Sequence, residues 1–394
     1  MTAPLRSPAP HVVIVGGGGT GAALALDLVL RGLRVTLVER GEITSGTTGR
    51  HHGLLHSGAR YAVNDAESAV ECIQENQLLR RVAPGSFEEN DGLFVGIDDE
   101  DMAYGEKLFA ACGETGIPAR WLTPAEALNL EPNLNPDLKG AIQVPDATFD
   151  AMRLPLRWFA TAKARGAVIQ PFCEVTEMVV RDACVMGVRG HDHRTERDFE
   201  VGADLVVNAG GPWAEKIAAM AGADVPIQPS PGVLLALRGR LCNMVINRMH
   251  KSGDGDIVVP QRGLSIVGTS SWVVKDPDDL GVPEDHVQKM YTEGSKIIPA
   301  VRSAPFRQAW SAARPLIGGG GADTGRELSR TFKCFDHMER DGVGGFVTIS
   351  GGKATTARAM AETTADVVCR KLGIEAPCLT RETVLLPHTA YYAA

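Results

Sequence analysis

The stretch HVVIVGGGGTGAALALDLVLRGLRVTLVER, residues 11–40, decides the fold class of this chain. It opens on HVVIV, a continuous apolar run that is typical of a strand buried on both faces of a sheet. Glycines follow, then a segment that is apolar nearly all round, and then a second apolar run, RVTLVER. A strand, a glycine turn, a buried helix and a second parallel strand make one right-handed βαβ unit. The chain is therefore predicted to adopt an α/β fold with a parallel sheet.

The glycine turn has the spacing of a dinucleotide-binding loop. Gly16, Gly18 and Gly21 follow the pattern GxGxxG between the first strand and the helix. The first glycine permits a tight turn, the second lets the backbone approach a pyrophosphate, and the third lets the helix pack closely on the sheet. Glu39 ends the second strand, where a carboxylate suits two ribose hydroxyls. The turn therefore predicts a bound dinucleotide.

The rest of the chain favours FAD over NAD as that dinucleotide. A simple NAD-binding domain continues in alternating strands and helices, whereas this chain returns to the pattern twice, at VVNAGG and TISGGKATTA. Gly351 and Gly352 stand at a strand-to-helix junction, where a helix N-terminus can stabilise negative charge on a reduced flavin ring. Each Gly-Gly pair alone can be an ordinary loop turn with no role in ligand binding. Their joint occurrence with the first loop predicts FAD.

Strand-rich stretches lie between these nucleotide-binding segments, so two interleaved domains are expected. The fold is predicted to be a Rossmann-like FAD-binding domain of the glutathione-reductase or amino-acid-oxidase type with an antiparallel-sheet substrate (cap) domain. The FAD-binding domain is expected at 1–85, 146–222 and 336–380, the cap domain at 86–145 and 223–335, and a loose C-terminal tail at 381–394.

Composition and charge limit the classes of partner. The 394 residues include 40 basic and 48 acidic ones, and the net charge of −8 disfavours nucleic acid or an anionic membrane surface. No apolar run approaches the ~20 residues of a spanning helix, and the N-terminus shows no signal peptide. The eight cysteines form no CxxC pair, so no metal site is expected and reduced thiols in a cytoplasmic protein are the simplest interpretation.

Several further motifs resemble those of one enzyme family. The chain resembles the FAD-bearing catalytic subunits of anaerobic, quinone-linked glycerol-3-phosphate dehydrogenases in the segments GLRVTLVERGEITSGTTGRHHGLLHSGARYAVNDAESA, PDATFD, VVNAGGPWA, VINR, DIVVP, SIVGTSS, ARPL, LSR and GFVTISGGKATTARAMAE. The resemblance implies oxidation of sn-glycerol 3-phosphate to dihydroxyacetone phosphate, with hydride passing from C2 to flavin N5. It also implies partner subunits that deliver electrons to membrane quinone, and hence peripheral association with the inner face of the membrane.

The chain departs from this family at three places. Family members usually continue into a cysteine-rich 2Fe–2S region, which is absent here, so the electron acceptor is left open. Leu234 stands where aerobic relatives carry a histidine, which the anaerobic enzymes lack as well. Ala357 replaces a common tyrosine after GGKATT, and the change is expected to alter the preference among polyol phosphates.

The stretch RHHGLLHSGARY, residues 50–61, is expected to face the flavin. His56 can accept the hydroxyl proton, because an unperturbed imidazole titrates near neutrality; the alternative is a hydrogen bond to a flavin carbonyl. A phosphate dianion needs cationic partners, and arginine binds it bidentately, although any single arginine can instead form a surface ion pair. The resemblance implies the catalytic residues His56, Arg60 and Arg314, and the substrate-binding residues Arg60, Tyr61, Arg314, Arg330 and Lys353.

The remaining candidates are expected to contact FAD or to line its site, whereas Arg358 is expected to be structural. The predicted cofactor-binding residues are Gly16, Gly18, Gly19, Thr20, Gly21, Glu39, Arg40, Thr47, Thr48, His52, Gly53, Leu55, His56, Val175, Ala209, Gly210, Trp213, Arg314, Gly351, Gly352, Lys353, Ala354 and Thr355.

Other functions stay open at this point. A flavin dehydrogenase or oxidase can act on another polyol phosphate, or on a small 2-hydroxy acid or amino acid, whose carboxylate a single arginine can hold. The several cationic positions favour a phosphate. An FAD-binding electron-transfer protein is the non-enzyme alternative, and the presence of His56, Arg60 and Arg314 argues against it. The sequence is compatible with a homo-oligomer.

Overall fold

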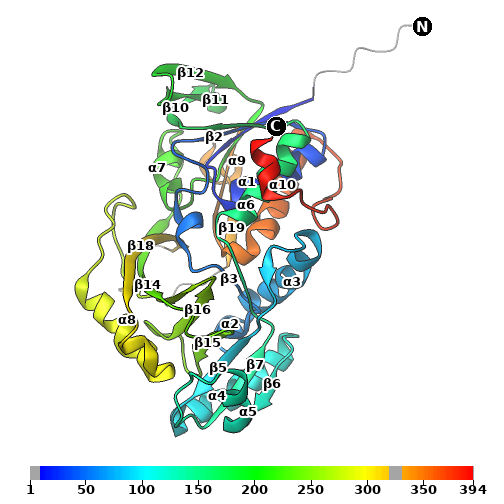
Figure 1. The fold of residues 1–394 in the computed structure, drawn as a ribbon. Helices are drawn as coiled ribbons and strands as arrows, with labels where there is room; N and C mark the ends of the chain where they lie inside the picture. Colours follow the sequence, from blue (N-terminus) through cyan, green and yellow to red (C-terminus); the bar gives the residue numbers. More distant parts are fainter. Residues whose placement is uncertain (1–8, 319–330, 394) are drawn as a thin grey trace.

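Two large sheets dominate the computed structural model, which describes residues 9–318 and 331–393 (Figure 1). The first sheet has six strands in the order β19-β20-β13-β1-β2-β9. Its strands are β1 (His11–Val15), β2 (Arg34–Glu39), β9 (Val168–Pro171), β13 (Leu205–Asn208), β19 (Phe332–Asp336) and β20 (Phe346–Gly351). All neighbouring pairs are parallel except β19 with β20. The predicted α/β class with a parallel sheet is confirmed.

Alternate residues of β1 face opposite sides of this sheet, as the pleat of a strand requires. Val12 and Ile14 pack in one core with α1 (Gly19–Leu30), α6 (Arg153–Ala164) and α10 (Ala357–Leu372). Val13 and Val15 pack in a second core with a small antiparallel sheet and a short helix. The elements on that side are β10 (Cys173–Arg181), β11 (Cys184–Asp192), β12 (Arg197–Gly202) and α7 (Ala214–Ala219). The strand is therefore buried on both faces, as its unbroken apolar run predicts.

The second large sheet has eight strands in the order β18-β14-β17-β16-β15-β5-β7-β6 and occupies the lower part of Figure 1. Its strands are β5 (Gly92–Gly96), β6 (Arg120–Leu122), β7 (Gly140–Val144), β14 (Ile227–Arg238), β15 (Val245–Arg248), β16 (Ile257–Gln261), β17 (Leu264–Gly268) and β18 (Phe306–Ile317). β5 and β15 pair in parallel, and the other neighbours are antiparallel. α8 (Glu284–Ile297) packs on this sheet through Val287, Met290 and Ile297.

The other elements of the described residues include a small three-stranded sheet and five further α-helices. A three-stranded sheet contains β3 (Leu54–Leu55), β8 (Ala147–Phe149) and β4 (Phe87–Glu88), and the remaining helices are α2 (Ala59–Ala62), α3 (Ala66–Val82), α4 (Asp99–Glu114), α5 (Pro124–Leu130) and α9 (His337–Asp341). The eight-stranded sheet combines strands from both segments expected to form the cap domain. The two-domain division itself stays a prediction, and its boundary at residue 336 falls inside β19, which pairs with β20 in the six-stranded sheet.

The C-terminal segment expected to be a loose tail is packed onto the fold. Leu385 is 2% exposed, and its N–H donates to the carbonyl oxygen of Val82 at 2.7 Å. Arg157 of α6 donates to the carbonyl oxygens of Leu385 and Leu386. The ring of Tyr391, in the short helix His388–Tyr392, packs against Phe159. The expectation failed because the residues that anchor this segment, Val82, Arg157 and Phe159, lie far away in the chain.

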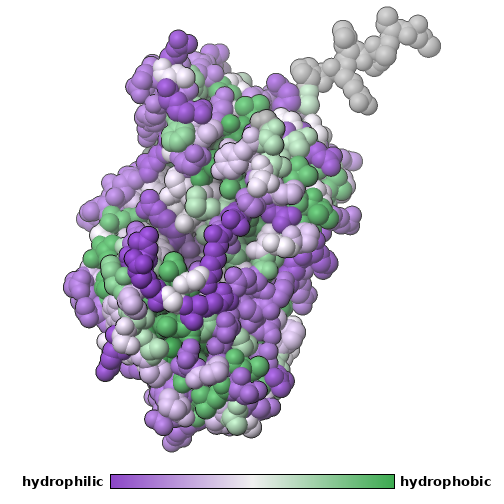
Figure 2. All heavy atoms as spheres, viewed as in Figure 1, coloured by the Kyte–Doolittle hydropathy of each residue, from purple (hydrophilic) through white to green (hydrophobic). Residues whose placement is uncertain are grey.

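The surface is mixed in character. On the face shown in Figure 2, hydrophilic residues cover most of the molecule and hydrophobic residues are scattered between them. Within residues 9–318 and 331–393, none of the helices combines the length and the apolar character needed to cross a membrane.

Candidate functional site

Both large sheets border a cavity of about 1520 Å³. Val15, Val38 and Ile349 contribute to its lining from the six-stranded sheet, and Leu234 and Ile257 contribute from the eight-stranded sheet. Most small-molecule sites have volumes of roughly 300–1,000 Å³. The cavity therefore has room for a long ligand together with a second, smaller molecule.

The GxGxxG turn lies at this cavity and requires glycine at its first and last positions. Gly16 has a φ angle of 117°, and a Cβ there would stand 2.5 Å from the carbonyl oxygen of Ala209. A Cβ on Gly21 would stand 2.0 Å from the carbonyl oxygen of Gly16. Gly18 is the N-cap of α1 and makes no side-chain capping bond. The N-terminus of α1 is therefore able to bind an anionic group.

Two side chains hold this turn in place. Glu39 accepts hydrogen bonds from the backbone N–H groups of Gly17 at 2.7 Å and Gly41 at 2.9 Å. The hydroxyl of Thr48 accepts a hydrogen bond from the N–H of Gly19 at 3.0 Å. A carboxylate has about four acceptor positions, so Glu39 keeps acceptor capacity for ligand hydroxyls.

Three histidines of the 50–61 stretch also line the cavity. The ring centroid of His56 lies 6.1 Å from that of His52. Burial lowers the pKa of His51 to about 4 and the pKa of His52 to about 3. Burial, followed by the neighbouring groups His52, Arg60 and Lys353, lowers the pKa of His56 well below its ordinary value. All three imidazoles are neutral at pH 7, so each has a ring nitrogen able to accept a hydrogen bond.

Arg60 is the first of the predicted cationic residues at the cavity. It lies on α2, which begins directly after Gly58, and the φ angle of 101° at Gly58 lets the chain turn into this short helix. Its guanidinium donates to Oδ1 of Asp256 at 2.5 Å and to Oδ1 of Asn247 at 3.1 Å. The side chain of Arg60 is 13% exposed, so the ion pair is largely removed from water.

Arg314 lies on β18 and reaches the same cavity. Its guanidinium donates to the carbonyl oxygens of Ser230 at 3.3 Å and Ser270 at 3.2 Å, and to the hydroxyl of Thr269. Neutral oxygens of β14 and of the loop after β17 therefore fix the plane of this guanidinium.

Lys353 reaches the cavity from the turn after β20. Its Nζ lies 5.0 Å from the centroid of the Tyr61 ring and 3.8 Å from Oε2 of Glu71. The Tyr61 ring in turn lies 5.4 Å from that of His56. The fourth predicted cationic residue, Arg330, lies outside the described residues.

The model of one protein family covers almost the whole of this architecture. The family described as DAO, FAD dependent oxidoreductase, matches residues 11–367. The chain belongs to this family. FAD is therefore the cofactor of this flavin oxidoreductase, and the predicted fold type and cofactor are confirmed.

Two sequence relatives and one solved structure are similar to this oxidoreductase over most of its length. The oxidoreductase is 45% identical to one component of the anaerobic glycerol-3-phosphate dehydrogenase of Escherichia coli K12, over 96% of this chain and 70% of that protein. It is 42% identical to the corresponding component of the Haloferax volcanii enzyme, over 95% of this chain and 66% of that protein. The FAD complex of the Bacillus halodurans glycerol-3-phosphate dehydrogenase superposes with a TM-score of 0.74 at 25% identity, over 96% and 68% of the two chains. The predicted family resemblance is confirmed.

FAD fits the side chains that the oxidoreductase presents. Nδ1 of His52 is buried at the cavity and has no hydrogen-bond partner in the described part of the chain, so it has capacity for a ligand donor or acceptor. The glycine turn and the N-terminus of α1 suit the pyrophosphate, and Glu39 suits a ribose. Most of the predicted cofactor residues line the cavity. They are Gly16, Gly18, Gly19, Thr20, Glu39, Arg40, Thr47, Thr48, His52, His56, Val175, Ala209, Gly210, Trp213, Arg314, Gly351, Gly352, Lys353 and Ala354.

Four predicted cofactor residues lie behind the cavity wall. Gly21 packs α1 against the turn, and Leu55 is fully buried in the core under β3. A Cβ on Gly53 would stand 2.2 Å from the carbonyl oxygen of Phe149. The hydroxyl of Thr355 accepts the N–H of His56 at 3.1 Å. These four residues are not among those that line the cavity, and their predicted contact with FAD stays a prediction.

Sequence reasoning missed other residues of the site. Asp256 and Asn247 hold Arg60, and Thr269 holds Arg314. All three lie in segments that carry the family resemblance, DIVVP, VINR and SIVGTSS, which was the available signal. Ala357 lines the cavity beside the glycine turn, 3.8 Å from the place of a Cβ on Gly19, and its effect on substrate preference stays a prediction.

Proposed function

We propose that this oxidoreductase oxidises sn-glycerol 3-phosphate to dihydroxyacetone phosphate. The observation that carries the proposal is that Arg60, Arg314 and Lys353, from three separate elements, line one cavity together with His56. A phosphate dianion that leaves water needs several cationic partners. The names of the relatives from Escherichia coli and Haloferax volcanii point to the same substrate.

The cationic residues bind and orient the phosphate in this proposal. A guanidinium has five N–H donors, so the bonds to Asp256 and Asn247 leave Arg60 able to donate to a phosphate oxygen as well. The two nearly parallel N–H bonds of an arginine also fix the direction in which the rest of the substrate extends. The carbinol end is thereby held toward His56.

His56 is the proposed acceptor of the hydroxyl proton. Bound FAD supplies an acceptor for the hydride that the alcohol loses. The pKa of His56 is lowered by burial and, among other neighbours, by Arg60 and Lys353. A dianion bound to those two cations offsets their effect, so substrate binding raises the proton affinity of His56 when the proton must be accepted.

Electrons leave the reduced enzyme through a partner in the proposal. The relatives from Escherichia coli and Haemophilus influenzae are named as single subunits of an enzyme, which indicates assembly with other chains in those proteins. We propose that this chain also passes electrons to partner subunits and from there to quinone, and that such partners bring it to the inner face of the membrane from the cytoplasm.

An anaerobic flavin-reduction screen tests the function. The purified FAD-loaded protein is mixed without oxygen with sn-glycerol 3-phosphate, glycerol, other polyol phosphates, small 2-hydroxy acids and amino acids. We expect the flavin absorption to bleach with sn-glycerol 3-phosphate and to persist with glycerol, which lacks the phosphate. Bleaching only with another polyol phosphate would show that this compound is the substrate. Bleaching only with a hydroxy or amino acid would contradict phosphate binding. No bleaching with any compound would support an electron-transfer role.

A further inference from the structure

One buried carboxylate contacts two walls of the cavity. Asp256 is 1% exposed and directly precedes β16. Its Oδ1 lies 2.5 Å from a guanidinium nitrogen of Arg60 on α2. Its Oδ2 accepts the N–H of Gly253 at 2.6 Å and lies 3.3 Å from Nε2 of His250. The carboxylate therefore joins α2 to the loop 249–255.

Arg60 is held at two points of its guanidinium. One terminal nitrogen donates to Asp256 and the other donates to Oδ1 of Asn247 at 3.1 Å. Two acceptors on different nitrogens fix both the place and the plane of the group. Arg60 lines the cavity, whereas Asp256 and Asn247 stand behind it.

The loop 249–255 carries a cation that the sequence did not reveal as a site residue. Lys251 and Ser252 line the same cavity as Arg60. The hydrogen bond from the N–H of Gly253 to Asp256 fixes the loop next to these residues. The same carboxylate thus sets the position of one cationic side chain directly and of a second one through the backbone.

We propose that Asp256 is a positioning residue for the substrate phosphate. It acts through Arg60 and the loop 249–255, and the inference rests on the proposed oxidation of a phosphorylated alcohol. The charge of Asp256 opposes anion binding, so its presence next to a phosphate site weakens purely electrostatic attraction. Its contribution is geometry, because a misplacement of about 1 Å in a positioning group can cost about 100-fold in rate.

A neighbouring ion pair provides a matched control. Arg248 follows Asn247 on β15, and its Nε lies 3.0 Å from Oδ2 of Asp101, which is also 1% exposed. Neither Arg248 nor Asp101 is among the described residues that line the cavity. Asp101→Asn therefore removes a comparable buried carboxylate from the same region without touching the proposed phosphate site.

Steady-state kinetics with an artificial electron-accepting dye test the proposal. We expect Asp256→Asn to lower kcat/KM for sn-glycerol 3-phosphate by about 10- to 100-fold, with the larger part of the change in KM. Asp101→Asn should leave both kcat and KM within about twofold of wild type. Unchanged or lowered KM in Asp256→Asn, with FAD still bound, would overturn the proposal. Asp256→Glu, which keeps the charge, is expected to recover part of the loss.

A double-mutant cycle separates positioning from general damage. If Asp256 acts through Arg60, Asp256→Asn adds little further loss in an Arg60→Ala background. Additive losses contradict the proposal. If Asp256→Asn does not fold, Asn247→Ala is used in its place. This variant removes an acceptor of Arg60, and it breaks no other side-chain hydrogen bond of Nδ2, which has no partner within residues 9–318 and 331–393. An unaltered KM in that variant also contradicts the proposal.

Failure of the proposed function is recognised separately. If sn-glycerol 3-phosphate does not bleach the wild-type flavin, the substrate assignment fails and the same variants are compared by calorimetric titration with inorganic phosphate. A dissociation constant raised about tenfold or more in Asp256→Asn, and unchanged in Asp101→Asn, supports positioning of an anion. Equal dissociation constants in all three proteins overturn it.

Discussion

At the scale of single residues, His56 combines two properties that a proton acceptor in this site needs. Its ring is neutral at pH 7, because burial and then neighbouring groups, Arg60 and Lys353 among them, lower its pKa. Its backbone N–H donates to the hydroxyl of Thr355 at 3.1 Å, which fixes the chain where the side chain leaves it. The Tyr61 ring, 5.4 Å away, borders the imidazole on one side. In the proposed mechanism, a bound anion offsets the effect of Arg60 and Lys353 and so raises the proton affinity of this imidazole.

His56→Gln tests this role. Glutamine keeps a hydrogen-bonding group at the position but cannot take up a proton, and a general base contributes about 10²–10⁴-fold to a rate. We expect the rate constant of flavin reduction to fall by at least about 100-fold, with little change in FAD content. His51→Gln is the control, since Nδ1 of His51 accepts the N–H of Gly53 at 2.8 Å and supports the loop. An unaltered reduction rate in His56→Gln would reassign the residue to structure.

At the scale of elements, the stretch 50–61 concentrates buried neutral imidazoles in one short segment. The folded pKa values of His51, about 4, and His52, about 3, lie below the 6.5 of an exposed histidine. The unfolded chain therefore binds more protons as the pH falls below 6.5. Each such group costs about 1.4 kcal/mol of unfolding free energy per pH unit in that window.

Asp146 acts in the opposite direction. Burial raises its pKa to about 6, above the ordinary 3.8, so the folded chain binds this proton at a higher pH than the unfolded chain does. Asp146 therefore adds to the unfolding free energy as the pH falls from about 6 to 3.8. Two histidines outweigh one aspartate, and we expect the FAD-free protein to lose unfolding free energy between about pH 6.5 and 5. Urea unfolding at both pH values measures this. Equal or greater stability at the lower pH would contradict the expectation, and His52→Gln should reduce the pH dependence.

Local elements were predictable from the sequence, and long-range partners were not. The βαβ unit and the glycine turn follow from residues 11–40 because their causes, apolar runs and the need for glycine at Gly16 and Gly21, are local. The pairing of Arg60 with Asp256 joins residues far apart in the chain, and no spacing rule connects them. The packed C-terminal segment was missed for the same reason.

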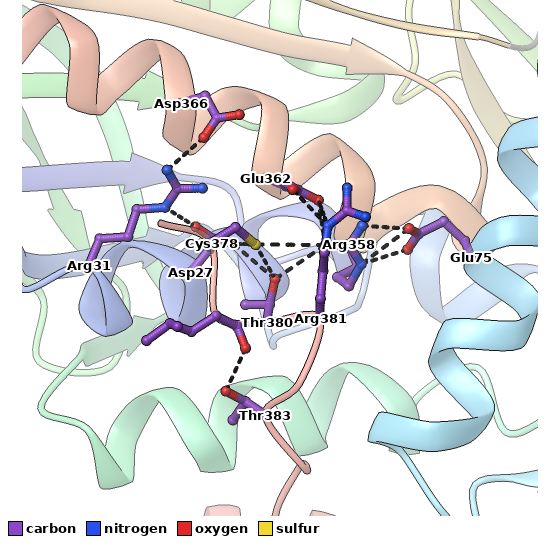
Figure 3. A network of polar contacts seen from close by, with 11 residues as sticks. Asp27, Arg31, Glu75, Arg358, Glu362, Asp366, Cys378, Thr380, Arg381 and Thr383 are labelled. Carbon is purple, nitrogen blue, oxygen red and sulfur yellow. Dashed lines mark hydrogen bonds and ion pairs between the residues drawn. The ribbon is translucent and has the colours of Figure 1, made fainter. Parts of the chain in front are cut away.

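At the scale of the whole molecule, one buried polar network ties distant segments together (Figure 3). Arg358 of α10 is 1% exposed and donates to both oxygens of Glu75 on α3, at 2.9 Å and 2.5 Å. It also donates to Glu362 at 2.7 Å and to the hydroxyl of Thr380 at 3.3 Å. The hydroxyl of Thr380 in turn donates to Oδ2 of Asp27 on α1 at 2.9 Å. The network therefore joins α1, α3, α10 and the C-terminal segment, and Arg358 stands apart from the residues that line the cavity.

Arg358→Met separates stability from catalysis. The substitution leaves the buried carboxylate of Glu75 without its cation, and breaking a buried pair in this way costs about 3–5 kcal/mol. We expect that loss in urea unfolding, with the flavin-reduction rate constant within about threefold of wild type, because the cavity wall is untouched. Arg381→Met is the control: Arg381 also pairs with Glu362, but its side chain is 58% exposed, so its loss should cost no more than about 1 kcal/mol. Combining Glu75→Gln with Arg358→Met removes the unpaired buried charge and should recover much of the lost unfolding free energy. Equal unfolding free energies for wild type and Arg358→Met would mean that the network does not stabilise the contacts among these four segments.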